Sequence, residues 1–281
     1  MLSEKAVIAR ISISAWQPKR LSKRASEVIC ITLNTDKNFT AGMKYLIDPS
    51  ELSMISSLCS KARAYHYAET LPFGEHGDRL LASDLVTKYI AGINQIKDEF
   101  NVQVGKFVAK YDGLIEAARP KLGELWNPED YPKDIASKFS ISVQISPVPE
   151  SGHFMVDLEN ENLREVKAKL DQELETQVNE ALADVFHRVR KIVSKVDERL
   201  SAEKPRIYDS MINNVKDMID TLPVLNVTGD KRIKKLIQEM QDTLGKRDPQ
   251  ELRESKQARQ DTKAEAKRIL NRLDAYAGRG K

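Results

Sequence analysis

Apolar residues recur every three or four positions along two long stretches of the chain, and most residues between them are charged or polar. The first stretch covers residues 83–118 and the second covers residues 159–204. In both, the mean spacing of the apolar positions is about 3.7 residues, which is the period of a nearly straight α-helix. Each helix would carry one narrow apolar face, so each needs a partner that covers it.

The two apolar faces are similar enough for each helix to be the partner of the other. The first face comprises Leu85, Tyr89, Ile93, Ile96, Phe100, Val104, Phe107, Tyr111, Leu114 and Ala118. The second comprises Leu163, Val166, Leu170, Leu174, Val178, Leu182, Val185, Val189, Ile192, Val196 and Leu200. The matched periods predict a long antiparallel, coiled-coil-like helical hairpin over residues 83–204.

The connection between the two helices has the pattern of a small β element. Turn signals that contain proline follow Trp126 and Tyr131. Residues 139–145 alternate apolar and polar side chains as a half-buried strand does, and residues 154–156 fit a returning strand. Residues 119–158 are therefore expected to form a β element at the tip of the helical hairpin, where Trp126 and Tyr131 are candidate contact residues for a partner.

The N-terminal region, residues 1–82, has the pattern of a small mixed α/β structure. Residues 7–16 alternate apolar and polar side chains and predict a strand. Residues 20–33 mix basic and aliphatic side chains and are expected to be helical. Asp48 and Pro49 form the N-cap and first turn of a further helix.

Residues 205–281 predict a C-terminal group of shorter helices. Two amphipathic segments, residues 207–222 and 233–244, precede a last helix that begins at Asp248. The first half of that last helix has almost no apolar face. The expected fold class is mainly α, with the long hairpin, its β element, a small mixed α/β N-terminal part and short C-terminal helices.

The composition fits a helix-rich protein rather than a disordered one. Of the 281 residues, 31% are charged and 6% are aromatic, and there are only 12 glycines and 11 prolines. Cys30 and Cys59 lie in apolar segments and are expected to be buried free thiols in a reducing compartment. The N-terminus lacks a signal-peptide pattern, and no apolar run approaches the ~20 residues of a membrane span. We therefore expect a soluble, intracellular protein without membrane contact.

Motifs that carry catalysis or bind cofactors are missing from the sequence. It has no glycine-rich phosphate-binding loop, no Gly-x-Ser-x-Gly turn and no pair of histidines or cysteines at metal-ligand spacing. Asp157, Glu159 and Glu161 form an acidic cluster that either binds a divalent cation or faces the free N–H groups in the first turn of a helix. No catalytic residue, metal ligand or cofactor is expected.

Positive charge is concentrated at both ends of a chain whose formal net charge is only +3. Residues 1–28 carry six basic and two acidic side chains, and residues 246–281 carry eleven basic and six acidic ones. The candidate contact residues for nucleic acid or a partner protein are Lys19, Arg20, Lys23, Arg24, Arg253, Lys256, Arg259, Lys263, Lys267 and Arg268. Such a helix can follow a phosphate backbone, whereas its interleaved acidic residues also fit a solvated helix with internal charge pairs.

Three short motifs have counterparts in a known family: the strand that ends at Trp16, the run FVAKYD at residues 107–112, and the segment 139–149. Together they resemble a family of bacteriophage and prophage proteins of unknown function, over residues 7–200. In that family an Arg/Lys-Tyr-Asp step on a helix precedes a turn with Trp and Pro and a strand that ends in Pro. Members are often encoded beside a MoxR-type AAA+ ATPase and a von Willebrand A-type protein. The resemblance implies a phage accessory protein and supplies no catalytic residues.

The function expected from these observations is that of a non-enzymatic interaction protein, a phage-encoded adaptor or scaffold that acts through long helices. Its partner would be an AAA+ ATPase or a host factor. A DNA-binding protein of phage replication or recombination is the main alternative, and an inhibitor of a host defence protein is another. A homo-oligomer is expected only if the two long apolar faces extend beyond each other.

Overall fold

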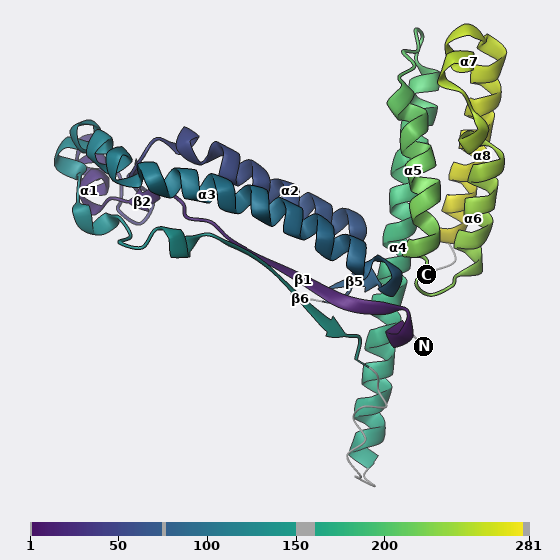
Figure 1. The fold of residues 1–281 in the computed structure, drawn as a ribbon, viewed down its shortest axis with the longest axis horizontal. Coiled ribbons are helices and arrows are strands. Elements are labelled where there is room, and N and C mark those ends of the chain that lie inside the picture. The colour runs from purple at the N-terminus through teal and green to yellow at the C-terminus, as the bar shows by residue number, and fades with distance from the viewer. Residues whose placement is uncertain (1, 75–76, 150–160, 278–281) are drawn as a thin grey trace. The chain divides into compact units, whose positions relative to one another are not determined.

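The computed structural model describes residues 2–74, 77–149 and 161–277 (Figure 1). Its α-helices are α1 Lys23–Leu33, α2 Ser53–Glu69, α3 Val86–Leu122, α4 Glu161–Ser201, α5 Asp209–Leu225, α6 Lys231–Asp242, α7 Pro249–Glu254 and α8 Lys256–Ala277. Its strands are β1 Ala6–Ser14, β2 Lys19–Leu21, β3 Met43–Tyr45, β4 Leu71–Pro72, β5 Arg79–Ala82 and β6 Ser140–Pro147. The prediction of a mainly α fold is confirmed.

The chain divides into two compact units, and each has its own hydrophobic core. Unit 1 comprises Met1–Arg10, Glu69–Thr87 and Ile145–Lys281, and unit 2 comprises Ile11–Ala68 and Lys88–Gln144. The predicted division at residues 82 and 204 follows changes of pattern along the chain. The two compact units are defined by contacts, and β1, α2, α3 and β6 each contribute residues to both.

The apolar face of α3 lies in unit 2, as a continuous stripe along the helix. Its buried side chains are Tyr89, Ile93, Ile96, Phe100, Phe107, Tyr111 and Ala118. Helix α2 contributes Ile55, Leu58, Cys59 and Ala62 to the core of this unit. Phe139 closes that core, since its ring lies edge-on to Phe100 and Phe107 at centroid distances of 6.5 and 5.6 Å. The stripe predicted for the first long helix is confirmed.

The apolar face of α4 lies in unit 1. From Leu174 to Leu200 its predicted stripe positions are buried or partly buried. Helices α5, α6 and α8 supply the other side of this core. Helix α8 runs antiparallel to α4, because Phe186 packs on Tyr276 at a centroid distance of 5.6 Å and Arg190 forms an ion pair with Asp274 one turn further along α4.

The predicted pairing of the two long helices with each other is wrong. The stripe of α3 belongs to the core that α2 completes, and the stripe of α4 belongs to the core that α5, α6 and α8 complete. The physical reason is that a helical period specifies a covered face but not what covers it. The shorter helices supply the apolar surface that each long helix needs.

The predicted strand at residues 139–145 is confirmed as β6, but its place differs from the prediction. It lies at the edge of a four-stranded sheet of order β4-β5-β1-β6, so its neighbour is the N-terminal strand β1. Strands β1 and β5 are antiparallel, with Ala6 opposite Ala82 and Ala9 opposite Arg79. The expected returning strand at residues 154–156 lies outside the described residues.

The last predicted helix is divided at Ser255 into α7 and α8. The side chain of Arg259 donates from Nη1 to the carbonyl oxygens of Leu252 and Arg253, at 2.9 and 3.1 Å, and so satisfies the C-terminal end of α7. In the first half of α8 the buried residues are small: Ala258 and Thr262, followed by Ala266. This half therefore does have a core face, made of side chains too small to register as an apolar stripe.

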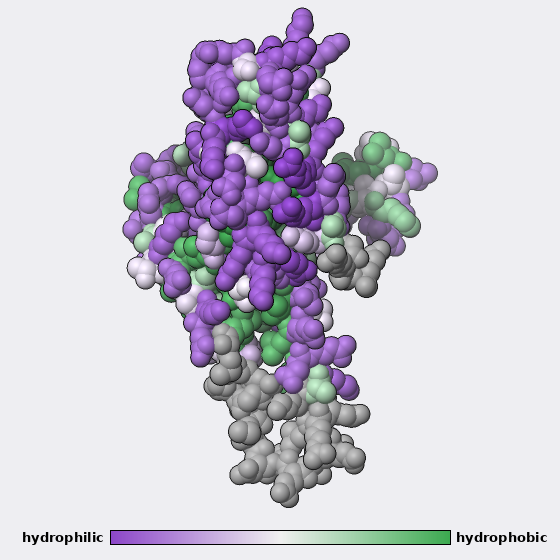
Figure 2. Space-filling model, turned by 90° about the vertical axis from the view of Figure 1, so that its right-hand side faces the viewer, coloured by the Kyte–Doolittle hydropathy of each residue, from purple (hydrophilic) through white to green (hydrophobic). Residues whose placement is uncertain are grey.

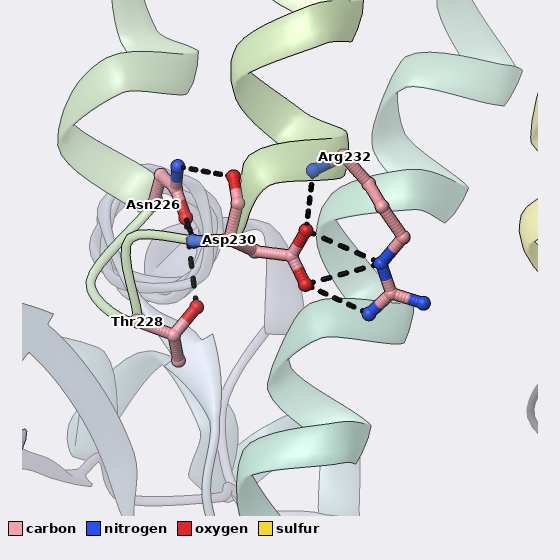
Figure 3. A network of polar contacts seen from close by, with 4 residues as sticks. All are labelled: Asn226, Thr228, Asp230 and Arg232. Atoms are coloured by element: carbon pink, nitrogen blue, oxygen red, sulfur yellow. Dashed lines mark hydrogen bonds and ion pairs between the residues drawn. The ribbon is translucent and has the colours of Figure 1, made fainter.

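The turn between α5 and α6 is held by a network of side-chain contacts (Figure 3). The amide of Asn226 exchanges hydrogen bonds with the backbone of Asp230, accepting from its N–H at 2.7 Å and donating to its carbonyl at 3.0 Å. Between them Gly229 has φ of 71°, a conformation that favours glycine. Asp230 caps α6 by accepting from the Arg232 N–H at 2.6 Å, and its carboxylate pairs with the Arg232 guanidinium at 2.8 Å.

Asp230→Ala is expected to lower the free energy of unfolding of unit 1 by about 1–2 kcal/mol near pH 7, because it removes an N-cap and an ion pair. Contacts with Arg232 hold the pKa of Asp230 below its ordinary value. The stabilisation is therefore fully present above the unfolded pKa of about 3.9, and it is lost as the pH falls through the lower folded pKa. Urea unfolding at a series of pH values measures this loss.

Asp230→Asn is the matched control for this prediction. Asparagine keeps an acceptor for the N-cap but removes the charge, so its loss near pH 7 should be smaller than that of alanine. A difference between the wild type and Asp230→Ala that stays constant down to about pH 2 would contradict the role of the carboxylate.

Candidate interaction surface

Strands β2 and β3 form a two-stranded antiparallel sheet whose two faces differ. In its register Lys19 lies opposite Tyr45, Arg20 opposite Lys44, and Leu21 opposite Met43. Because side chains alternate along a strand, Arg20 and Lys44 lie on one face and the other four residues lie on the opposite face.

The face with Arg20 and Lys44 is anchored on Asp130, in the segment that follows α3. The Asp130 carboxylate lies 3.4 Å from Nε of Arg20 and 2.5 Å from Nζ of Lys44. Lys44 Nζ also donates to the carbonyl of Leu125 at 2.5 Å. Although Lys44 is a lysine it is only 9% exposed, so this anchor is part of the interior of unit 2.

Trp126 and Tyr131 lie in the same segment, close to the basic residues of the N-terminal part. The Tyr131 hydroxyl donates to the carbonyl of Leu46 at 2.7 Å, and burial raises the pKa of Tyr131. The Trp126 ring lies under the guanidinium of Arg119, 4.9 Å from its carbon. Tyr131 is buried and therefore serves mainly to position the segment, while Trp126 is half-buried.

Helix α1 has a cap at each end, and the Ser26 hydroxyl in its first turn accepts from the N–H of Gly42 at 2.9 Å. Ser22 is the N-cap and accepts from the N–H of Ala25 at 3.2 Å. Gly42 passes close to this first turn, and a Cβ there would lie 2.8 Å from Ala25, so only glycine allows the approach. Asn34 ends the helix in the left-handed conformation. No residue of α1 is fully buried.

Helix α1 and strand β2 lie at one end of unit 2 (Figure 1). Large apolar side chains are exposed on α1, on the β2–β3 sheet and on the loop that joins α1 to β3. Ile31 is 82% exposed and Phe39 is 90% exposed. The complete set is Leu21, Val28, Ile31, Leu33, Phe39, Met43 and Tyr45. We call these seven residues, together with the basic residues Lys19, Lys23 and Arg24, the α1 surface.

The basic residues of the α1 surface differ in their contacts. Lys19 and Lys23 are exposed and have no ion pair among the residues that the structure describes. Arg24 forms an exposed ion pair with Glu124, which contributes little to stability in water. The structure therefore brings together the four predicted N-terminal basic residues and Trp126 with Tyr131, which the sequence suggested as two separate candidate sites.

The six predicted basic residues of the C-terminal helices lie in unit 1 and fall into two groups. Arg253 donates to the carbonyl of Ile207 at 3.2 Å and pairs with Asp209, and Arg259 satisfies the end of α7, so these two hold the helices together. Over the described part of the chain, no ion pair involves the remaining four, which are Lys256, Lys263, Lys267 and Arg268. The side of the C-terminal helices turned to the viewer in Figure 2 is largely hydrophilic.

The structure also bears on the two cysteines, the predicted acidic cluster and the presence of metal-binding or membrane-spanning segments. Cys59 is buried, which raises its pKa, and Cys30 is half-buried; both are free. Asp157 and Glu159 lie outside the described residues, and so does the side chain of Glu161. Among the side chains of residues 2–74, 77–149 and 168–277, no group of three or more His, Cys, Asp or Glu is placed to hold a metal ion. The same part of the chain contains no helix that is both long and apolar enough to span a membrane.

Comparison with known families shows which family the sequence matches. The sequence matches the family described as "Protein of unknown function (DUF3150)" over residues 3–264. The chain belongs to the DUF3150 family. This confirms the expected likeness to an uncharacterised family, while its phage origin and its gene neighbours stay predictions. No curated protein and no solved structure matches the chain.

The exposed apolar side chains of the α1 surface were not predicted. The sequence of residues 20–33 does show aliphatic residues among basic ones, which was the available signal. An amphipathic helix in a globular protein normally buries its apolar face, so the pattern alone predicts burial. Only the structure reveals that Val28, Ile31 and Leu33 face solvent.

Proposed function

We propose that this DUF3150 protein is a non-enzymatic adaptor or scaffold, and that it binds a partner protein through the α1 surface. The observation that carries this proposal is the exposure of seven large apolar side chains within residues 21–45. Single exposed apolar residues are ordinary, but a concentration of them with a polar rim is characteristic of protein interaction sites. The partner would cover side chains such as Ile31 and Phe39.

The contacts that fix the α1 surface to the rest of unit 2 also support an interaction role. The end of α3 and the segment after it hold the β2–β3 sheet through the Asp130 anchor, and Gly42 holds the first turn of α1. A surface fixed in this way loses little conformational entropy when a partner binds. Helix α3 has 37 residues and is about 55 Å long, which suits a protein that presents a binding surface at the end of a long support.

The resemblance to phage and prophage proteins suggests where such a surface would act. The partner we favour is the AAA+ ATPase encoded beside members of that family, in the cytoplasm of the host bacterium. A host factor is the alternative partner. An inhibitor of a host defence protein would use the same kind of surface, so the identity of the captured partner distinguishes these roles.

DNA binding in phage replication or recombination is the second candidate function. It is favoured by the row of Lys256, Lys263 and Lys267, which recur at spacings of seven and four residues along one side of α8. A cationic row of this kind can follow a phosphate backbone, with affinity that falls steeply as salt rises. A gel-shift series in rising salt tests it, and no shift at low salt would rule it out.

Affinity capture with a matched pair of variants tests the adaptor role. Ile31→Ser removes an exposed side chain of the α1 surface, whereas Val102→Ser removes an exposed apolar side chain from α3 outside that surface. Neither should unfold the protein, because both side chains face solvent. We expect mass spectrometry to identify one partner with the wild type and with Val102→Ser, and at least tenfold less of it with Ile31→Ser. Equal recovery with all three proteins would refute docking at the α1 surface.

A further inference from the structure

We infer that the α1 surface recognises an acidic amphipathic helix of its partner. This inference rests on the proposed function and adds to it the chemistry of the bound segment. Three features of the α1 surface support this inference: the exposure of its apolar side chains, the short length of its strands and the positive charge of its rim. Each of them restricts the kind of segment that fits.

The apolar side chains of the α1 surface are well exposed to solvent. Ile31 lies near the end of α1 and Phe39 in the following loop, and both are more than four-fifths exposed. Leu21 and Met43 are directly opposite each other on the exposed face of the β2–β3 sheet, so they form one contiguous apolar contact. The partner must therefore bring several apolar side chains of its own, arranged along one side.

A helix supplies such a row better than a strand does. An added strand would gain affinity from main-chain hydrogen bonds along a sheet edge. Strands β2 and β3 have only three residues each, so their edges offer few such bonds. An amphipathic helix instead presents apolar residues at positions i, i+3, i+4 and i+7 on one face, which matches a surface whose apolar contacts come from side chains.

The charges on the α1 surface favour an acidic partner. Residues 19–45 carry six basic and two acidic side chains. Asp130 is engaged by Arg20 and Lys44 on the opposite face of the sheet, and Glu124 is engaged by Arg24. Lys19 and Lys23 form no ion pair in the described part of the chain. With Glu27 and Asp36 counted, the rim still has more basic than acidic side chains, so it attracts carboxylates and repels a basic segment.

An anionic lipid surface shares part of this chemistry but fits less well. Glu27 lies between Lys23 and Ile31 on α1, and Asp36 lies three residues before Phe39. Insertion of Ile31 and Phe39 into a bilayer would bring both carboxylates towards anionic headgroups, which repel them. A helix of a protein partner can place polar or basic residues opposite these two positions.

Fluorescence anisotropy with synthetic peptides tests the inference on the full chain. Four labelled peptides of about eighteen residues are compared. Three share one leucine-rich helical face and carry glutamate, glutamine or lysine on the other, and the fourth has the composition of the glutamate peptide in a scrambled order. Vesicles of phosphatidylcholine with phosphatidylglycerol form a separate arm.

We expect the glutamate peptide to bind at least tenfold more tightly than the lysine and scrambled peptides, and to weaken as salt rises. Val28→Ser with Ile31→Ser should weaken its binding at least tenfold. Lys19→Glu with Lys23→Glu should reverse the preference towards the lysine peptide. The matched control is Lys106→Glu with Lys138→Glu, which makes the same charge change at exposed positions of unit 2 outside the α1 surface and should change nothing.

Several results would overturn the inference. They are equal binding of the glutamate and lysine peptides, absence of peptide binding, and binding of vesicles alone. A capture experiment that depends on Ile31 while the glutamate peptide fails would leave the adaptor role intact and remove only the acidic helix. Binding of the glutamate peptide without any captured partner would support the preference for an acidic helix and count against the adaptor role.

Discussion

Phe100→Ala is expected to lower the free energy of unfolding of unit 2 by about 3–5 kcal/mol, the largest effect of any substitution considered for that unit. Phe100 is 0% exposed, and its ring packs edge-on to Phe139 in the core that α2 and α3 share. Truncation removes the buried ring and leaves a cavity that the rigid helices cannot close fully.

Hydrogen exchange read by mass spectrometry locates this effect as well as measuring it. Protection should fall in peptides from α2 and α3 and remain close to that of the wild type in peptides from α5 to α8, because their buried residues form a different core. Val102→Ala, two residues away on the same helix but 56% exposed, is the control and should cost less than about 1 kcal/mol. An equal loss of protection in both units would show that the two cores unfold together.

Ala266→Leu is expected to lower the free energy of unfolding of unit 1 by about 2–3 kcal/mol, because it adds bulk where there is no space. Ala266 is 0% exposed and follows two further small buried residues, Ala258 and Thr262, on the face of α8 that enters the core. Leucine has helix propensity close to that of alanine, so the predicted loss is one of packing alone.

Ala264→Leu makes the identical change two residues away and serves as the control. Ala264 is exposed, so the added side chain should alter the free energy of unfolding by no more than about 0.5 kcal/mol. Urea unfolding followed by circular dichroism measures both variants. If the two behave alike, the small residues of α8 are not a close-packed face.

The two long helices show what a periodic pattern can and cannot predict. The stripe from Tyr89 to Ala118 and the stripe from Leu174 to Leu200 were correct because the spacing of apolar residues depends only on helix geometry. Their partners were not predicted correctly. Pairing depends on side-chain volumes and on chain connections that bring α2 or α8 to the right place, and a period contains neither kind of information.

The α1 surface shows the same limit for a candidate site. The basic residues Lys19 and Lys23 could be found from the sequence because charge is a property of each residue. Exposure is a property of the whole fold. Val28 and Ile31 have the spacing of an ordinary buried face, so the local sequence predicts that another element covers them. In the structure both are exposed. The small face of α8 was missed for the opposite reason, since alanine and threonine add little to an apolar pattern.

The division of unit 1 into three chain segments affects the order in which the newly made polypeptide can fold. Every residue of unit 2 has been synthesised by Gln144, whereas the first ten residues of the chain belong to a unit that is completed only by the C-terminal helices. Since domains generally fold as units, beginning with those made first, unit 2 can acquire its core while translation is still in progress. The core of unit 1 can form only after α5 to α8 have emerged from the ribosome. Until then it is incomplete for two segments made earlier, Met1–Arg10 and Glu69–Thr87.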